Sequence, residues 1–194
     1  VRIQESKKGA HTSLTQTCFL FALTVLRGEG YNEWKRQKDI LRSEKEAANV
    51  AITSLEQYML DYVQAIRDET KRLGFEELRT PEEVEAKLPS AKGTALVLVN
   101  SVCGCAGGLC RPALAEALKH EAKPDHLFTV FAGQDKEATA KAREYFAPYP
   151  PSSPSIALMK DGELVHFIER HQIETRTVEE IADELKSAFD QYCR

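Results

Sequence analysis

One short segment constrains the fold more than any other feature: residues 94–100 read Thr-Ala-Leu-Val-Leu-Val-Asn, with five apolar residues in succession. An apolar run without polar alternation is typical of a strand buried on both faces, at the centre of a sheet that helices cover. The chain has 194 residues, enough for one ordinary domain and an appendage. The sequence therefore predicts a single α/β domain built around this strand.

The segment before this run has the pattern of an amphipathic helix. Ser54 and Gln57 form a capping box, and apolar residues then recur at helical spacing until Gly74, which favours a helix end. Residues 75–78 suit a short edge strand, and the Thr-Pro pair at 80–81 predicts the start of another helix. We therefore expect the folded domain to begin at Ser54.

Helix and strand patterns continue to alternate after residue 100. We expect a helix at 111–121, a strand at 127–131, a helix at 135–146, strands at 155–159 and 163–168 around a turn at Asp161-Gly162, and a last helix after Thr177. A βαβ half followed by a ββα half is the element order of the thioredoxin fold. The predicted fold class is therefore α/β and thioredoxin-like, with helices on both faces of a central mixed sheet.

Residues 1–53 differ in character from this domain. Their stretch 32–49 is rich in Lys, Arg and Glu and has few apolar positions to bury. We expect 1–53 to be an N-terminal extension, helical or loosely packed, and 54–194 to be the thioredoxin-like domain. The apolar run at 18–26 resembles part of a signal peptide, but it is too short to cross a bilayer and no cleavage pattern follows. We therefore expect a cytoplasmic protein with no membrane partner.

Charge and cysteine content narrow the class of function. The formal net charge is -4 with both signs mixed along the chain, so we expect no nucleic-acid partner. Three of the cysteines fall within eight residues, and the full set is Cys18, Cys103, Cys105, Cys110 and Cys193. An odd, clustered set is typical of reactive or metal-binding thiols in a reducing compartment, and not of a secreted disulfide framework.

The candidate site is Cys103-Gly104-Cys105. Cys103 lies between the end of a predicted strand and the start of a predicted helix, where free backbone N–H groups and the helix dipole favour thiolate over thiol. The thiolate attacks disulfides, so Cys103 is the candidate nucleophile. Gly104 is expected to let the loop turn tightly, and Cys105 lies close enough to resolve a mixed disulfide on Cys103.

A second stretch points to the same chemistry. Residues 151–163 read Pro-Ser-Ser-Pro-Ser-Ile-Ala-Leu-Met-Lys-Asp-Gly-Glu and resemble the thioredoxin segment in which a cis-proline precedes a strand and a hairpin. Pro154 matches that proline, which in the thioredoxin fold faces the attacking cysteine beside backbone that pairs with an incoming peptide. We therefore expect a cis bond between Ser153 and Pro154, and substrate contacts from Ser153, Pro154 and Gly104.

Longer strings resemble the bacilliredoxin family. They are Val-Asn-Ser-Val-Cys-Gly-Cys-Ala-Gly-Gly at 99–108, Pro-Asp-His-Leu at 124–127, Val-Phe-Ala-Gly-Gln-Asp-Lys-Glu-Ala-Thr at 130–139 and Arg-His-Gln-Ile-Glu at 170–174. The resemblance implies a cytoplasmic thiol–disulfide oxidoreductase that removes bacillithiol from mixed disulfides on client proteins, with weak disulfide isomerase or reductase activity. By the same resemblance Cys103 takes up bacillithiol and Cys105 is its partner thiol.

The resemblance also implies the other components of the reaction. It implies no cofactor, because bacillithiol acts as a thiol co-substrate. The implied partners are bacillithiolated client proteins, bacillithiol itself and a disulfide reductase system that recycles it. Residues 1–53 have no counterpart in the family, and Cys110 stands where we expect a residue other than cysteine.

Several alternatives stay open from the sequence. Cys110 is either a second resolving thiol or a small buried residue. The three clustered thiols could instead hold zinc or an iron–sulfur cluster, although the second ligand pair of a structural zinc site is missing, so we expect no metal. His126, His166 and His171 are either proton relays or packed or solvated imidazoles. A general disulfide isomerase or reductase, or a metal-binding protein, are the alternative functions.

Overall fold

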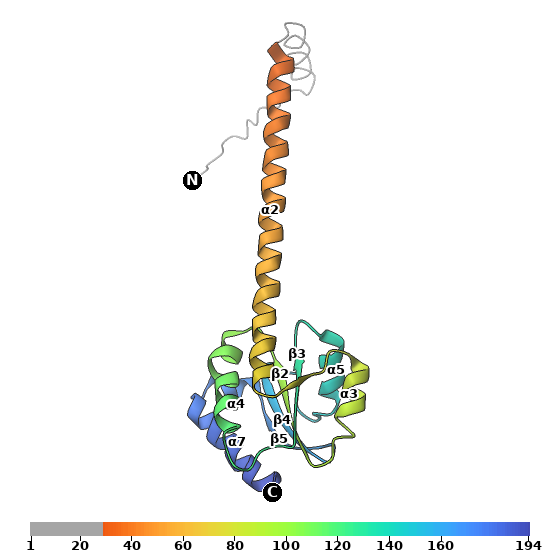
Figure 1. The fold of residues 1–194 in the computed structure, drawn as a ribbon, viewed down its shortest axis with the longest axis vertical. Helices are drawn as coiled ribbons and strands as arrows, with labels where there is room; N and C mark the ends of the chain where they lie inside the picture. Colours follow the sequence, from red (N-terminus) through yellow and green to blue (C-terminus); the bar gives the residue numbers. More distant parts are fainter. Residues whose placement is uncertain (1–28) are drawn as a thin grey trace, which may run out of the picture. The chain divides into compact units, whose positions relative to one another are not determined.

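The computed structural model describes residues 29–194 (Figure 1). The signal-like run at residues 18–26 and Cys18 therefore lie outside the described residues. Within residues 29–194, none of the helices combines the length and the apolar character needed to cross a membrane. The chain divides into two compact units, Val1–Met59 and Leu60–Arg194.

The first described helix, α2, spans Glu29–Arg72 without a break. The helix start expected at Ser54 is therefore wrong: the Lys- and Glu-rich stretch before it consists mainly of good helix formers, so the local capping signal does not interrupt the helix. The apolar residues after Ser54 were expected to form a buried face, and this prediction is wrong for the first part of that stretch. Leu55 and Tyr62 are exposed, and the first buried residue is Ile66. The predicted limits of the domain, 54–194, stay a prediction.

The end of α2 is as expected. Gly74 has a φ of +95°, a conformation that glycine adopts without strain, and its N–H donates to the Lys71 carbonyl at 3.0 Å.

Five strands form one mixed sheet in the order β1-β3-β2-β4-β5. Their bounds are Glu76–Glu77 for β1, Thr94–Asn100 for β2, His126–Phe131 for β3, Ser155–Lys160 for β4 and Glu163–Ile168 for β5. β1 and β2 both run parallel to β3, whereas β4 is antiparallel to β2 and to β5. This is the thioredoxin fold, and every residue of the central strand β2 is buried, as its apolar run predicts.

Helices cover both faces of this sheet (Figure 1). α3 and α5 pack together on one face, and α4 and α7 pack together on the other. The bounds are Pro81–Lys87 for α3, Arg111–Ala117 for α4, Lys136–Glu144 for α5, Arg170–Glu174 for α6 and Val178–Tyr192 for α7. A π-helical turn, η1, at Ala106–Cys110 leads directly into α4. α4 and α5 end earlier than predicted, and α6 is an element that the sequence patterns did not indicate.

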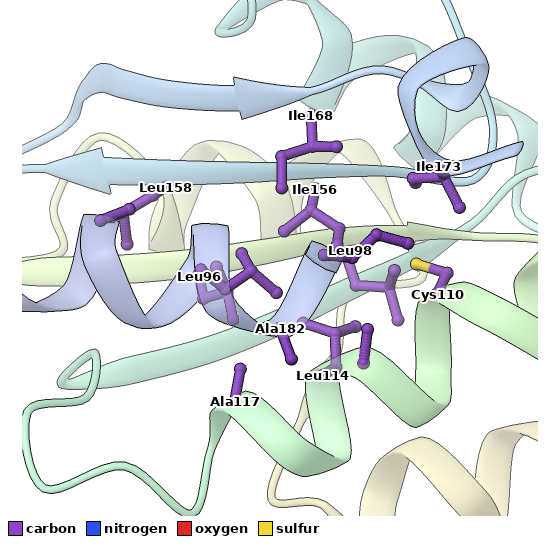
Figure 2. Packing of buried hydrophobic residues seen from close by; sticks show 14 of the residues in the cluster. Leu96, Leu98, Cys110, Leu114, Ala117, Ile156, Leu158, Ile168, Ile173 and Ala182 are labelled. Carbon is purple, nitrogen blue, oxygen red and sulfur yellow. The ribbon is translucent and has the colours of Figure 1, made fainter. Parts of the chain in front are cut away.

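Alternate residues of β2 supply the two halves of the core. Leu96 and Leu98 pack with α4 and α7, where Figure 2 shows them beside Leu114 and Ile156. Val97 lies in the opposite half, which α3 and α5 close. Full burial of a leucine side chain stabilises a fold by about 1.5–3 kcal/mol, so β2 anchors both layers.

Local signals account for several boundaries. Thr80 caps α3 and Thr177 caps α7, each through a reciprocal pair of hydrogen bonds with the glutamate three residues later. Asp161 and Gly162 both have positive φ, as a tight turn between β4 and β5 requires. Both signals were readable from the sequence and are confirmed.

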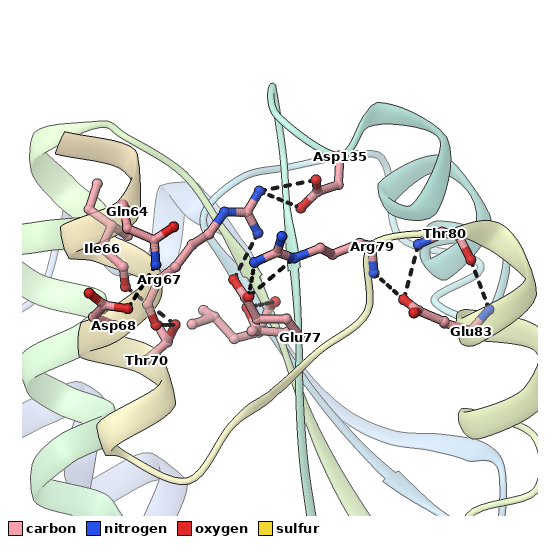
Figure 3. A network of polar contacts seen from close by, with 12 residues as sticks. Gln64, Ile66, Arg67, Asp68, Thr70, Glu77, Arg79, Thr80, Glu83 and Asp135 are labelled. Atoms are coloured by element: carbon pink, nitrogen blue, oxygen red, sulfur yellow. Dashed lines mark hydrogen bonds and ion pairs between the residues drawn. The ribbon is translucent and has the colours of Figure 1, made fainter. Parts of the chain in front are cut away.

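One ionic network joins the end of α2 to the sheet (Figure 3). Arg67 donates to Glu77 on β1 at 2.8 Å and to both carboxylate oxygens of Asp135 at 2.9 and 3.0 Å. Asp135 stands at the N-cap of α5 as expected, but its side chain makes no capping hydrogen bond because Arg67 takes both oxygens. The last turns of α2 are thereby tied to β1 and to the start of α5.

Candidate active site

Cys103 lies in the short connection between β2 and the helical residues 104–117. Its carbonyl oxygen accepts hydrogen bonds from Ala106 N at 3.1 Å and Gly107 N at 3.3 Å, which closes the first turn of the helical segment. Cys103 and Cys105 are both free thiols and half-buried. Cys103 therefore stands at the start of a helix, as the sequence predicts.

Gly104 differs from the expectation in its physical role. Its backbone has no positive φ, so the turn does not need glycine, and a Cβ at this position would meet no atom within 4 Å. The space beside Gly104 is open, and a substrate contact at this residue stays a prediction.

Two polar groups lie within hydrogen-bond distance of the Cys103 sulfur. The Ser101 hydroxyl lies 3.1 Å from it, and Ala106 N–H donates to it at 3.4 Å. Burial opposes the charged form, but hydrogen bonds from Cys105, Ser101 and Ala106, with the positive charge of Arg170, hold the pKa of Cys103 below its ordinary value. Cys103 is thus the thiol that ionises first.

Cys105 has the opposite shift. Burial, the hydrogen bond and charge of Cys103, and a hydrogen bond to the Glu174 carboxylate raise the pKa of Cys105 to about 11. Cys105 therefore stays a protonated thiol at pH values where Cys103 ionises. This division of charge is what an attacking and a resolving cysteine require.

Cys110 is fully buried and belongs to the core. Figure 2 shows its sulfur among Leu98, Leu114 and Ile173, and burial raises its pKa far above the ordinary thiol value. A thiol in such surroundings is inert. Of the two alternatives left open by the sequence, the geometry favours the small buried residue.

Arg170 links residues 153–154 to the two cysteines. The bond between Ser153 and Pro154 is cis, as expected, and Pro154 is buried; a second cis bond joins Ala147 to Pro148. Arg170 Nη1 donates to the Ser153 carbonyl at 3.3 Å, and the charge of Arg170 also acts on both Cys103 and Cys105. The substrate contacts of Ser153 and Pro154 stay a prediction.

Arg170 and Glu174 were not singled out in the sequence as site residues. They lie on α6, four residues apart, and Arg170 Nε donates to Glu174 Oε1 at 2.8 Å. An Arg-x-x-x-Glu spacing is a helix-stabilising pair, and it lies within the family string at 170–174. That spacing could have predicted the helix, although not its position beside the cysteines.

Arg111 binds the residues that precede the cysteines. It is almost fully buried, and its Nε donates to Glu69 Oε2 at 2.8 Å. Its Nη1 donates to Asn100 Oδ1 at 3.3 Å and to the Ser101 carbonyl at 3.4 Å. Arg111 thus holds the residues that carry the Ser101 hydroxyl toward Cys103.

The histidines have partners away from the cysteines. His126 Nε2 lies 3.2 Å from the Lys92 carbonyl, and His166 Nε2 lies 3.0 Å from Glu184. For His166, which is half-buried, the packed alternative fits the contacts, whereas His126 and His171 are exposed. Across residues 29–194, no group of three or more His, Cys, Asp or Glu residues is arranged to hold a metal ion.

Comparison with known proteins identifies the family. A family model described as "Disulphide isomerase" matches residues 58–193. A bacilliredoxin of Geobacillus kaustophilus is 60% identical over 139 residues, which make up 71% of this chain and 96% of the relative. The chain belongs to the bacilliredoxin family. A second bacilliredoxin, from Halalkalibacterium halodurans, is 57% identical over 138 residues, 71% of this chain and 96% of the relative.

Solved structures similar to this bacilliredoxin family member are thioredoxins. The Fasciola hepatica thioredoxin is 21% identical with a TM-score of 0.43 and covers 61% of this chain and 99% of its own. Thioredoxin O2 from Arabidopsis thaliana in the oxidized state is 19% identical with a TM-score of 0.42. The match covers 63% of this chain and 97% of that thioredoxin. At these scores the likeness adds nothing to the fold that the strand order already shows. As a bacilliredoxin with a thioredoxin fold, the protein is a thiol–disulfide oxidoreductase.

Proposed function

We propose that this enzyme removes bacillithiol from mixed disulfides on client proteins, with Cys103 as the attacking thiolate and Cys105 as the resolving thiol. The observation that carries the proposal is the opposite ionisation of the two thiols: the pKa of Cys103 is lowered and that of Cys105 is raised to about 11. The relatives that match are named bacilliredoxins, which supports bacillithiol as the small thiol.

The first step is a simple disulfide exchange. The Cys103 thiolate attacks the bacillithiol sulfur of a protein–S–S–bacillithiol adduct, a bond forms between these two sulfurs, and the client sulfur leaves as a thiolate. No electrons enter or leave the pair of reactants. The client is restored, and the enzyme carries bacillithiol on Cys103.

Substrate docking uses the surface around the two cysteines. We assign the open space at Gly104 to the incoming disulfide and the backbone at Ser153 and Pro154 to the client chain, which would pair with it as an added strand. The reaction belongs to a reducing cytoplasm, where a disulfide reductase system returns bacillithiol to its thiol form.

Single-cysteine variants test this assignment. Cys103→Ser should abolish exchange with a bacillithiolated model protein, because no ionised thiol remains to attack. Cys105→Ser should accept bacillithiol once and keep it on Cys103, as intact-mass spectrometry with peptide mapping would show. Cys193→Ser, which changes a half-buried thiol at the C-cap of α7, is the matched control and should exchange at the parent rate. An adduct on Cys105 with Cys103 unmodified would overturn the assignment.

A general disulfide isomerase or reductase is the second candidate function. It is favoured by the description of the matching family model, which names a disulphide isomerase. The two functions use the same cysteines and differ in substrate. Comparison of kcat/KM on one client carrying bacillithiol, glutathione or an internal scrambled disulfide separates them: equal values for all three would favour the general enzyme.

A further inference from the structure

A stripe of apolar side chains runs along the part of α2 that belongs to the first compact unit, Val1–Met59. Its positions alternate in spacing between three and four residues, as the a and d positions of a coiled-coil heptad do. The apolar members of this stripe are all exposed: Trp34, Leu41, Ala48, Ile52, Leu55 and Met59. A continuous apolar surface of this kind is rare on a single soluble chain and indicates a docking surface.

Two lysines occupy the remaining positions of the stripe, Lys38 and Lys45. Lys38 lies along the stripe, with its Nζ 3.9 Å from the centre of the Trp34 ring. Arg42 and Glu46 pair with each other within α2 at 2.9 Å, and both stand outside the a and d positions. The two lysines therefore decide which partner the stripe can accept and in which direction that partner runs.

The occupant that fits is a second copy of α2 in antiparallel orientation. In a parallel pair each a position faces its own counterpart, so Lys38 would face Lys38 and Lys45 would face Lys45, which places like charges in two layers. In an antiparallel pair each a position faces a d position. With the two stripes aligned end to end, Trp34 faces Met59, Lys38 faces Leu55, Leu41 faces Ile52 and Lys45 faces Ala48. A lysine stem can lie over leucine or alanine while its ammonium group reaches water.

The charges beside the stripe favour the same register. The e positions border the a and d positions, and the end-to-end alignment brings Lys35 of one copy beside Glu56 of the other. Both side chains are exposed, and the two-fold symmetry of the pair makes this contact twice. Lys38 approaches the same glutamate, because the leucine that it faces precedes Glu56. Along a single helix Lys35 and Glu56 stand about 30 Å apart, so they can pair only between two copies.

We propose that the stripe of α2 joins two copies of this chain in an antiparallel two-stranded coiled coil. The apolar residues of each stripe cover those of the other, and the paired Lys35 and Glu56 side chains set the direction. None of the paired residues belongs to the cysteine site. Both the single chain and the dimer should therefore exchange disulfides.

Sedimentation equilibrium of the full chain tests the association, with a reductant present so that cysteines cannot link the copies. We expect a reversible dimer. Ile52→Glu should raise its dissociation constant at least about thirtyfold, because each dimer would bury two carboxylates without partners. Val50→Glu is the matched control: Val50 is equally β-branched and exposed, but it stands on the outward face of the helix. This control should change the dissociation constant by less than about twofold.

Charge reversal tests the direction of the two helices. Glu56→Lys would bring Lys35 of one copy beside a lysine of the other, and it should weaken the dimer about tenfold at low salt. The double variant Lys35→Glu with Glu56→Lys restores opposite charges across the contact. Its dissociation constant should return to within about threefold of the parent value.

A chain that stays monomeric at every concentration would overturn the proposal, with residues 1–28 or a different protein as the cover of the stripe. A dimer that survives Ile52→Glu, or that Val50→Glu weakens equally, would also overturn it, because the copies would then meet elsewhere. If the double charge reversal fails to restore association, the antiparallel register is wrong.

Discussion

The Ser101 hydroxyl oxygen lies 3.1 Å from the Cys103 sulfur, one residue beyond the end of the central strand. This contact links the most buried element of the fold to its most reactive atom. Because β2 is fixed on both faces, Ser101 has little freedom to turn away, and the hydroxyl is held ready to stabilise the thiolate.

Ser101→Ala should therefore slow the first attack. A hydrogen bond to a charged group contributes about 1.5–3 kcal/mol when buried, and Cys103 is only half-buried, so we expect a roughly threefold to tenfold lower rate near neutral pH. Single-turnover exchange on a bacillithiolated client measures it. The matched control is Ser187→Ala, which removes an exposed hydroxyl bonded to the Asp183 carbonyl. Equal rates for the two variants would show that Ser101 does not support the thiolate.

The two site thiols should be alkylated in a fixed order as pH rises. The pKa of Cys103 is lowered, so its thiolate persists at pH values where an ordinary thiol is protonated, whereas the pKa of Cys105 is about 11. Iodoacetamide at neutral pH should modify Cys103 first, and Cys105 should follow more slowly. Peptide mapping by mass spectrometry reads both sites. Modification of Cys105 before Cys103 would contradict the assignment of charge.

Arg111→Ala should weaken both the fold and the site. The change leaves Asn100 and Glu69 without their donor beneath the cysteine loop. Because Glu69 is partly exposed, we expect the free energy of unfolding to fall by about 1–3 kcal/mol, less than for a fully buried pair. Urea unfolding measures it, and Arg194→Ala, which removes an exposed pair with Asp190, should change stability by less than about 0.5 kcal/mol. If Arg111→Ala lowers the free energy of unfolding no more than Arg194→Ala does, Arg111 does not stabilise the fold.

Much of the fold was predictable because its signals are local. The apolar run at Thr94–Asn100 gives β2 with its observed bounds, and the paired glycine and aspartate at the turn give the hairpin of β4 and β5. The start of α2 was not predictable from a capping box alone. Ser54 has the chemistry of an N-cap, but an N-cap residue marks a helix start only where the residues before it disfavour helix, and here they do not.

The cysteines of the site were predictable, whereas their polar partners were not. Cys103 and Cys105 were found from their spacing and from their place between a strand and a helix. Arg170 and Glu174 act on them from α6, across a separation in sequence of more than sixty residues. Side-chain contacts of this range are set by the packing of α6 against η1, which no local pattern encodes.

Deletion of residues 1–53 should leave the domain folded and active. Among the described residues before Ile66, all side chains are exposed or half-buried, so the deleted part of α2 contributes little to the core. We expect the thermal midpoint to change by less than about 4 °C, which corresponds to roughly 1 kcal/mol or less. Calorimetry and a single-turnover exchange assay test this. Loss of a cooperative transition would show that the extension belongs to the core.

The last prediction concerns the third clustered thiol, Cys110. Its sulfur is fully buried among apolar side chains, so a serine hydroxyl at this position would lack a partner, and Cys110→Ser should lower the free energy of unfolding by about 1–3 kcal/mol. Cys110→Ala removes only the sulfur and should cost about 1 kcal/mol or less. Urea unfolding compares the two variants.

Both Cys110 variants should exchange disulfides at the parent rate, because a buried thiol with a raised pKa supplies no nucleophile. Quenched-flow mass spectrometry of the Cys103 adduct provides the decisive measurement. If Cys110→Ala lengthens the lifetime of that adduct while the fold remains stable, then Cys110 becomes accessible during turnover and acts as a second resolving thiol. An unchanged lifetime leaves Cys105 as the partner of Cys103 and Cys110 as part of the core.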